Sequence, residues 1–202
     1  MILDPTRLDD EEDEKTKEQQ NAPAVIEKAL FDARVVMLTG EVNDQQARRV
    51  TERLFALAAQ NAKPITFVIS SPGGHVESGD MIHDVIKFIN APVKMLGTGW
   101  VASAGALIYC AAPRENRFCL PNTRFLLHEP RGGIGGMASD VEIQAREILR
   151  MRERLNRIFA DATNQPIDKI KRDIDRDYWM LADEAKAYGL VGKIVKSQAE
   201  LG

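Results

Sequence analysis

The sequence predicts an α/β domain in which helices cover a mostly parallel sheet. Short apolar runs rich in β-branched residues alternate along the chain with longer segments whose apolar residues recur every three to four positions. The short runs are almost continuously apolar, which is typical of strands buried on both faces of a parallel sheet. A chain of 202 residues is long enough to enclose one such domain with a sizeable core.

In the first half of the chain, strands and helices are expected to alternate three times. After a short helix at about 24–31, the pattern predicts strands at 34–38, 65–69 and 93–96 and helices at 44–60, 78–90 and 102–112. In the helix 78–90 the apolar residues should face the core, whereas His83 should lie at the surface or at its boundary. These apolar residues are Met81, Ile82, Val85, Ile86 and Ile89.

The second half of the chain is expected to contain one long helix at 139–163. Ser139 and Glu142 match the capping-box pattern at its start, and an apolar stripe runs along one face from Val141 to Phe159. Such a length is unusual in a compact domain, so the helix either lies across the domain or projects toward another subunit. The remaining elements expected are strands at 124–127 and 191–195 and a helix at 183–188 that ends at Gly189.

The first 20 residues form an acidic arm. They hold eight acidic and three basic side chains, so this arm carries a net charge of −5 and the rest of the chain +2. Arms of this composition are usually solvated tails, and a role in docking a partner is the alternative. We expect residues 1–22 to form a flexible arm and residues 23–202 a single domain. The acidity of the arm and its lack of an apolar segment argue against a secretory signal or a transit peptide.

Composition gives little reason to expect nucleic acid, a membrane, a metal or a cofactor. The net charge is −3, and the uncharged stretch 95–113, although long enough to cross a bilayer, is interrupted by Gly97 and Gly99. A buried strand, turn and helix explain this stretch better. Cys110 and Cys119 match no metal-binding or redox spacing and are expected to be free core residues. A reducing cytoplasm is therefore the expected location.

Three histidines are candidates for a catalytic base. His83 falls within a predicted helix. His75 follows a glycine pair, and the neighbouring sequence identifies no role for it. His128 lies where a buried strand ends, before a glycine-rich run, so its backbone would be fixed while its side chain reaches a cleft. The pattern alone leaves a purely structural role for His128 open.

Ser103 lies at the start of the helix expected at 102–112, directly after a buried strand and a glycine turn. The free amides and the positive dipole end of a helix favour negative charge at this position, and small neighbours leave room for a substrate backbone. The motif is not the Gly-x-Ser-x-Gly elbow of the α/β-hydrolases, because Val101 replaces its first glycine. Serine is also a common helix cap, so the nucleophile and cap readings both stay open.

Two further features could complete a hydrolytic site. Gly73 and Gly74 follow a strand and could present backbone amides to an oxyanion, although glycine pairs more often simply form turns. Asp173, Asp175 and Asp177 offer an orienting carboxylate but also salt-bridge partners, and the local pattern does not choose among them.

Ordered segments between about residues 24 and 195 together resemble the proteolytic subunits of the ATP-dependent Clp protease (ClpP), with the family's spacing between nucleophile, base and acid. These segments are Leu38-Thr39-Gly40, Ser71-Pro72-Gly73-Gly74, Gly99 to Gly105, Arg117 to Asn122, His128-Glu129-Pro130 with Gly132-Gly133, Ala145 to Leu149, Asp175-Arg176-Asp177, Glu184-Ala185 and Tyr188-Gly189-Leu190.

The resemblance implies a serine endopeptidase that hydrolyses unfolded polypeptide through an acyl-enzyme. It implies Ser103 as the nucleophile, His128 as the general base and Asp177 as the aspartate that orients the imidazole. The backbone amides of Gly74 and Ala104 match the positions that hold the oxyanion. The residues that match the family's substrate-pairing strand are Gly132, Gly133, Ile134 and Gly135.

The resemblance also implies a fold and an assembly. The fold would be crotonase-like, with the region of about 131–163 as a protruding handle that joins two heptameric rings into a tetradecamer. Asp175 and Arg176 match a pair that the family uses across the ring interface. A hexameric AAA+ Clp unfoldase, rather than this chain, would hydrolyse ATP and deliver the substrate.

The acidic arm departs from the apolar axial segment with which most family members begin. This departure suggests a divergent second paralogue, working in a mixed complex with another Clp subunit, or a chain whose start is processed. Two other functions compete with that of an active peptidase. A crotonase-fold enzyme acting on acyl-CoA needs no Ser–His pair at these positions, and a non-catalytic ring subunit usually lacks members of the triad.

Overall fold

The computed structural model of the chain describes residues 24–131 and 135–201. The chain divides into two compact units, Met1–Val35 and Val36–Gly202. The described part of the first unit contains a helix at 24–32, close to the range that the sequence predicts. The acidic arm expected at 1–22 lies outside the described residues, and the division of the chain into an arm and one domain stays a prediction.

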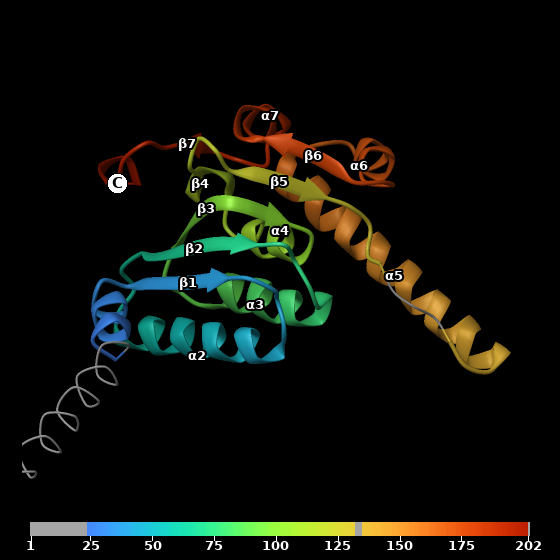
Figure 1. Cartoon of the computed structure of the whole chain (residues 1–202), viewed down its shortest axis with the longest axis horizontal. Helices are drawn as coiled ribbons and strands as arrows, with labels where there is room; N and C mark the ends of the chain where they lie inside the picture. Colours follow the sequence, from blue (N-terminus) through green and yellow to red (C-terminus); the bar gives the residue numbers. More distant parts are fainter. Residues whose placement is uncertain (1–23, 132–134, 202) are drawn as a thin grey trace, which may run out of the picture. The chain divides into compact units, whose positions relative to one another are not determined.

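The second unit is built on a sheet whose described strands number seven (Figure 1). The main path runs through β1 (Val35–Thr39), β2 (Ile65–Ser71), β3 (Val93–Ala102), β4 (Arg117–Cys119) and β7 (Lys193–Ile194), and β5 (Arg124–Leu127) pairs with both β3 and β6 (Tyr178–Leu181). The pairs β2–β3, β3–β4, β3–β5 and β4–β7 are parallel, whereas β5–β6 is antiparallel. The mostly parallel α/β fold predicted from the sequence is confirmed.

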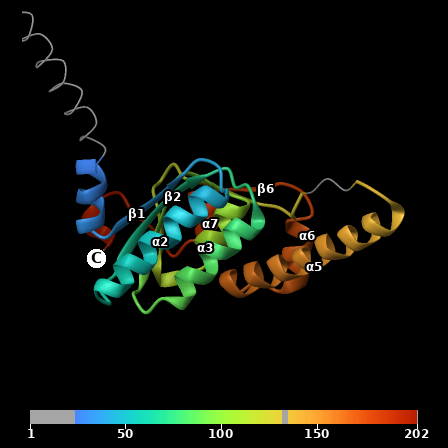
Figure 2. The same cartoon turned by 90° about the horizontal axis from the view of Figure 1, so that it is seen from below.

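Helices connect the parallel strands, because a parallel pair needs a crossover between its members. The α-helices are α2 (Asp44–Gln60), α3 (Val76–Phe88), α4 (Ala104–Tyr109), α5 (Ala138–Thr163), α6 (Ile167–Asp173) and α7 (Ala182–Tyr188). Two short 3₁₀ turns follow α4 and β7, at Arg114–Asn116 and Gln198–Leu201. Helices α2 and α3 lie side by side in both views, α3 also contacts α4, and α4 contacts α5 (Figures 1 and 2).

The burial of β2 explains why its sequence is almost continuously apolar. Ile65, Phe67 and Ile69 are fully buried, and the residues between them are half-buried rather than exposed. A central parallel strand covered on both faces has this pattern. The strand carries the chain to the Gly73–Gly74 turn at its carboxyl end.

The long helix predicted at 139–163 is confirmed as α5, but its predicted cap is wrong. Met137 occupies the N-cap position without a side-chain cap bond, and Ser139 lies inside the first turn. The apolar stripe is buried only near the C-terminal end, from Leu155 to Phe159. Ile143 and Leu149 are exposed, and this half of α5 extends away from the sheet (Figure 1).

The inward face of α3 also differs from the prediction. The helix begins at Val76 rather than at 78, and its buried face includes Ser78 and Ile82. Met81 was expected in the core but is exposed, and His83 was expected at the surface or boundary but is buried. Gly79, rather than Met81, lies against α4, since a Cβ added to Gly79 would come 3.2 Å from the Cβ of Ala104.

The strand β3 extends further than the predicted range 93–96. It continues past Gly97 and Gly99 to Ala102, and α4 begins two residues later at Ala104. The elements β4, β6 and α6 were not predicted, because each is only three to seven residues long and mixes charged with apolar side chains.

No helix within residues 24–131 and 135–201 combines the length and apolar character that crossing a bilayer requires.

Candidate active site

Ser103 lies between β3 and α4 in a strained backbone conformation. Its φ is 55° and its ψ −121°, a region that costs a residue with a side chain about 1–3 kcal/mol. The conformation is held because the Ser103 amide donates to the carbonyl of Leu126 at 2.9 Å. The Ser103 side chain makes no cap hydrogen bond to α4. Ser103 thus occupies the N-cap position of α4, as one interpretation of the sequence expected, but its hydroxyl does not cap the helix and is left for another use.

The turn after β2 lies directly against Ser103. A Cβ added to Gly73 would come within 2.6 Å of Ser103 Cβ and 2.9 Å of the Ala102 carbonyl oxygen, and the φ of Gly73 is +96°. Only glycine combines this φ with so close an approach. The glycine pair singled out in the sequence therefore borders the serine.

His128 and Asp177 are brought together by strand register. In the antiparallel pair β5–β6, Leu127, the last residue of β5, lies opposite Tyr178, the first residue of β6. His128 follows Leu127 and Asp177 precedes Tyr178, so the two residues face each other at the next position along the pair. Nδ1 of His128 lies 3.1 Å from Oδ1 of Asp177, and the His128 side chain is 13% exposed. Of the three aspartates that the sequence left open, Asp177 is the one beside this histidine. Asp173 instead accepts from Tyr188 and pairs with Lys169.

Ser103 and His128 line the same small cavity, together with Val76, Pro130 and Phe159. Within the described residues, no hydrogen bond joins the two side chains. Catalytic contacts are often long in the absence of substrate and shorten in the reacting complex. The cavity is therefore lined by a serine and by a histidine that contacts an aspartate, the residue types that nucleophilic catalysis requires.

Arg131 is a residue of this site that the sequence analysis missed. Its guanidinium donates to Oδ1 of Asp177, the same oxygen that His128 contacts. The sequence placed Arg131 only beside a glycine-rich run, which gave no indication of a contact with a residue 46 positions later.

The two backbone amides suggested for an oxyanion site are those of Ala104, next to Ser103 in the chain, and of Gly74, in the turn whose Gly73 contacts Ser103. Ala104 is the first residue of α4, where the amide has no acceptor within the helix. Gly74 forms a parallel bridge with Val42, but the bonds come from its neighbours, since Gly73 accepts from Val42 N and His75 donates to Val42 O. The Gly74 amide takes no part in that pairing.

The remaining predicted residues are only partly described. Gly132, Gly133 and Ile134 lie outside the described residues, and Gly135 is exposed with no atom within 4 Å of an added Cβ. Asp175 and Arg176 are both exposed. Within the chain, Asp175 lies 4.0 Å from Arg152, which also pairs with Glu129 at 3.0 Å.

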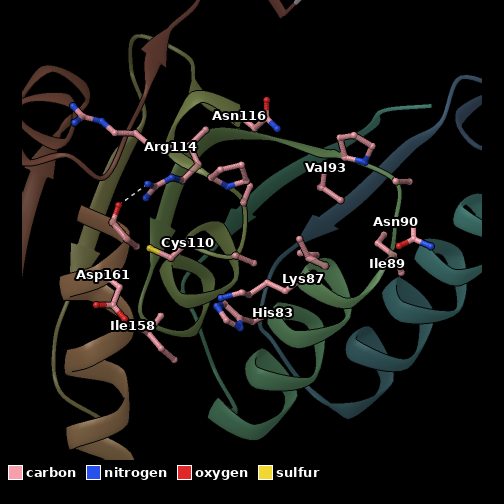
Figure 3. A pocket seen from close by; sticks show the side chains of 18 of the residues that line it. His83, Lys87, Ile89, Asn90, Val93, Cys110, Arg114, Asn116, Ile158 and Asp161 are labelled. Carbon is pink, nitrogen blue, oxygen red and sulfur yellow. Dashed lines mark hydrogen bonds between the residues drawn. The ribbon is translucent and has the colours of Figure 1, made fainter. Parts of the chain in front are cut away.

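A larger cavity of about 680 Å³ lies away from Ser103, between the end of α3, the end of α4 and the C-terminal part of α5 (Figure 3). His83, Cys110 and Asp161 are among the residues that line it. Arg117 lies in its wall, 2% exposed, and donates from Nη2 to the Ala162 carbonyl, while its Nε and Nη1 have no hydrogen-bond partner among the described residues. This cavity holds neither Ser103 nor His128, so the smaller cavity remains the candidate active site.

A mostly parallel α/β fold with a strained serine beside a histidine–aspartate pair is characteristic of a serine hydrolase. Comparison with known proteins narrows the class. A sequence profile of the Clp protease family matches residues 17–198, and the chain belongs to this family.

Relatives of this family match nearly the whole chain. The chain is 60% identical over 193 residues to the ATP-dependent Clp protease proteolytic subunit 3 of Rhizobium etli, covering 96% of this chain and 99% of that protein. It is 56% identical over 209 residues to the ATP-dependent Clp protease proteolytic subunit 2 of Gluconobacter oxydans, covering 98% and 94%. Among solved structures, ClpP1 from Listeria monocytogenes matches with a TM-score of 0.80 and 48% identity, over 88% of this chain and 99% of that one.

Proposed function

We propose that the chain is the serine endopeptidase subunit of a Clp protease, with Ser103, His128 and Asp177 as its catalytic triad. The observation that carries the proposal is the convergence of Ser103 and His128 on one cavity, with Asp177 at 3.1 Å from the histidine nitrogen Nδ1. Sequence identity near 60% to a curated proteolytic subunit supports the same activity.

Each side chain has a defined role in the proposed reaction. Nε2 of His128 takes the proton from Ser103 Oγ as this oxygen attacks the substrate carbonyl carbon. The proton then passes from His128 to the leaving amine as the C–N bond breaks, which leaves an acyl-enzyme on Ser103. Water attacks that ester and loses a proton to His128, which returns this proton to Ser103 Oγ as the ester C–O bond breaks, so that the carboxylic acid and the free serine are released. Asp177 remains ionised and holds the imidazole in the correct tautomer.

The negative oxygen that forms in both steps needs hydrogen-bond donors. The amides of Gly74 and Ala104 are proposed for this role, supported by their freedom from pairing in the sheet and helix. One such donor typically accounts for a factor of about 10²–10³ in turnover. Since no hydrogen bond joins Ser103 and His128 in the described part of the single chain, we propose that assembly or substrate binding brings them into contact.

The proposed substrate is unfolded polypeptide. Gly132, Gly133, Ile134 and Gly135 would pair with the substrate backbone as an added strand, and such pairing reads backbone shape more than side chains. Broad sequence specificity would follow.

We propose that the subunits associate into heptameric rings stacked as a tetradecamer, to which a hexameric AAA+ Clp unfoldase delivers substrate. The exposed apolar residues Ile143 and Leu149 on the projecting half of α5 support a handle that meets another subunit. Asp175 and Arg176, both exposed, are proposed to pair across the ring interface. A paralogous Clp subunit is a further proposed partner, because relatives carry the names subunit 2 and subunit 3.

A cytoplasmic location is proposed because the two cysteines are free and buried, as expected for a protein that folds in a reducing compartment.

Peptide cleavage by the wild type and by Ser103→Ala tests the function, with each protein assayed alone and with any co-encoded paralogue. We expect the wild-type particle to cleave an unstructured fluorogenic peptide and Ser103→Ala to lose about three or more orders of magnitude. Native mass measurement should show a fourteen-subunit particle in both cases. Equal cleavage by Ser103→Ala in the mixed particle would show that the paralogue alone does the chemistry, and a stable monomer would contradict the proposed assembly.

A further inference from the structure

A polar cluster centred on His75 lies next to the Gly73–Gly74 turn. Nδ1 of His75 lies 2.8 Å from Ser78 Oγ and 3.1 Å from Asp44 Oδ1, and its Nε2 lies 3.1 Å from Glu77 Oε2. The Ser78 hydroxyl donates to the same Asp44 oxygen. Three segments distant in sequence are therefore joined: the start of α2, the turn after β2 and the first turns of α3.

The cluster is not a second catalytic site. Ser78 is 3% exposed and its hydroxyl already donates to Asp44, so a substrate can neither reach it nor find it activated. The two carboxylates contact opposite nitrogens of His75, so they do not converge on one point. Consistent with this, no group of side chains in the described residues is arranged to hold a metal ion.

The cluster stabilises an ionised Asp44. The hydroxyl of Ser78, and after it the ring of His75, lower the pKa of the Asp44 carboxyl below its ordinary value. An ionised carboxylate accepts stronger hydrogen bonds than a neutral one and is favoured at the N-terminus of a helix. Asp44 therefore holds His75 and Ser78 at the start of α2, although its own side chain is 88% exposed.

The backbone beside His75 connects this anchor to the candidate active site. His75 N donates to Val42 O at 2.8 Å, and Val42 N donates to Gly73 O at 2.8 Å. A Cβ added to Gly74 would lie 2.2 Å from Val42 O, so the turn is pressed against the segment that leads into α2. On its other side, the same turn contacts Ser103. The position of the Gly74 amide relative to Ser103 therefore depends on how the turn is held against residues 42–44.

We infer that His75 is a positioning residue, whose contact with Asp44 and Ser78 locks the Gly73–Gly74 turn and thereby aims the Gly74 amide at the oxyanion. The inference rests on the proposed function, in which Gly74 is an oxyanion donor. His75 touches neither substrate nor the reacting atoms, and it acts only through the turn. Loss of His75 should therefore weaken stabilisation of the transition state and leave substrate binding unchanged.

The test compares His75→Ala, His75→Asn and Asp44→Asn in the assembled particle. Two quantities are measured for each: steady-state cleavage of a fluorogenic peptide and the affinity of a peptide boronic acid. The boronate forms a tetrahedral adduct with the nucleophilic serine and places a charged oxygen in the oxyanion site, so its affinity reports on the Gly74 amide. Glu52→Gln is the matched control, because it removes a carboxylate of α2 that pairs with Arg48 on the exposed face.

For His75→Ala we expect kcat/KM and boronate affinity to fall together by about tenfold, with KM changed less than about twofold. The fall should be smaller than that for complete removal of an oxyanion donor, because the Gly74 amide would be displaced and not lost. In His75→Asn the side-chain amide can replace Nδ1 as a donor to Asp44, and values should return to within about threefold of wild type. Asp44→Asn should resemble His75→Ala, and Glu52→Gln should match wild type.

Three results would overturn the inference: unchanged kcat/KM in an assembled His75→Ala particle, a fall in kcat/KM without a fall in boronate affinity, or a rise in KM alone. If His75→Ala does not assemble, Asp44→Asn decides, because its exposed position does not threaten folding. Failure of the proposed function is distinguishable, since the wild type would then cleave no peptide, or Ser103→Ala would cleave it as fast as the wild type, whatever the His75 variants do.

Discussion

His128 and Arg131 contact the same atom, Oδ1 of Asp177. The carboxylate that orients the proposed base is thus shared with a guanidinium whose side chain is 68% exposed. A cation at this oxygen withdraws part of the negative charge that would otherwise stabilise the imidazolium formed during proton transfer.

Replacing Arg131 by alanine should therefore raise turnover. We expect kcat to increase about two- to fivefold at low ionic strength, and the increase to vanish near 0.5 M salt, because salt screens charges in exposed positions. Peptide cleavage measured across a salt series checks this. Arg131→Lys keeps the positive charge and should stay at the wild-type rate. A tenfold loss in Arg131→Ala would mean that Arg131 is needed to hold the carboxylate in place.

Removing the charge of Asp177 should have a much larger effect. Asp177→Asn preserves size but favours the wrong tautomer of His128, so we expect kcat to fall by about 10²–10⁴ with little change in KM. The control is Asp168→Asn, which removes an aspartate from the first turn of α6. Activity of Asp177→Asn within threefold of wild type, in an intact particle, would remove Asp177 from the proposed triad.

The contact between Gly73 and Ser103 predicts that Gly73 tolerates no side chain. In Gly73→Ala, a methyl group would lie 2.6 Å from Ser103 Cβ, and the residue would keep an unfavourable φ of +96°. We expect more than about a hundredfold loss of cleavage, since a shift of one ångström at a reacting group has effects of this size.

Gly40→Ala separates backbone strain from this clash. Gly40 has a similar φ of +85°, but the nearest atom to an added Cβ, Nε2 of Gln46, is 4.0 Å away. Thermal unfolding should show a loss of about 1 kcal/mol for Gly40→Ala, with cleavage retained. Normal activity in Gly73→Ala would contradict the described position of the turn.

The two cysteines should resist alkylation in the folded protein. Burial raises the pKa of Cys110 to about 11 and that of Cys119 to about 12, with Arg117 opposing the shift at Cys110. At pH 8 the thiolate fraction of Cys110 is then on the order of one in a thousand. Mass spectrometry after iodoacetamide treatment should find no label in the native particle and two labels in denaturant. Rapid labelling of either cysteine without unfolding would contradict their buried state.

Local patterns were sufficient for much of the fold. The range of α2 matches its prediction because Asn43 caps the helix and Val50, Leu54 and Leu57 repeat at the helical period and are all buried. The range of β5 also matches. The cap of α5 was wrong because a capping-box sequence also fits inside a helix, and Met137 at the N-cap gives no sequence signal.

The candidate site was less accessible to sequence reasoning, because its contacts are long-range. Asp177 could not be chosen from local pattern, since its position opposite His128 depends on the register of β6, a strand that was not predicted. The resemblance to the Clp family named it instead. The roles of Arg131 and His75 depend on side-chain contacts 46 and 31 positions away, with Asp177 and Asp44. No periodicity reports such contacts.

Covalent labelling by a serine-directed phosphonate, with the modified residue located by mass spectrometry, tests the proposed triad most directly. We expect a single adduct on Ser103, absent in Ser103→Ala and formed far more slowly in His128→Ala. An assembled particle that acquires no adduct at Ser103, or that is labelled equally fast without His128, would contradict the proposed triad.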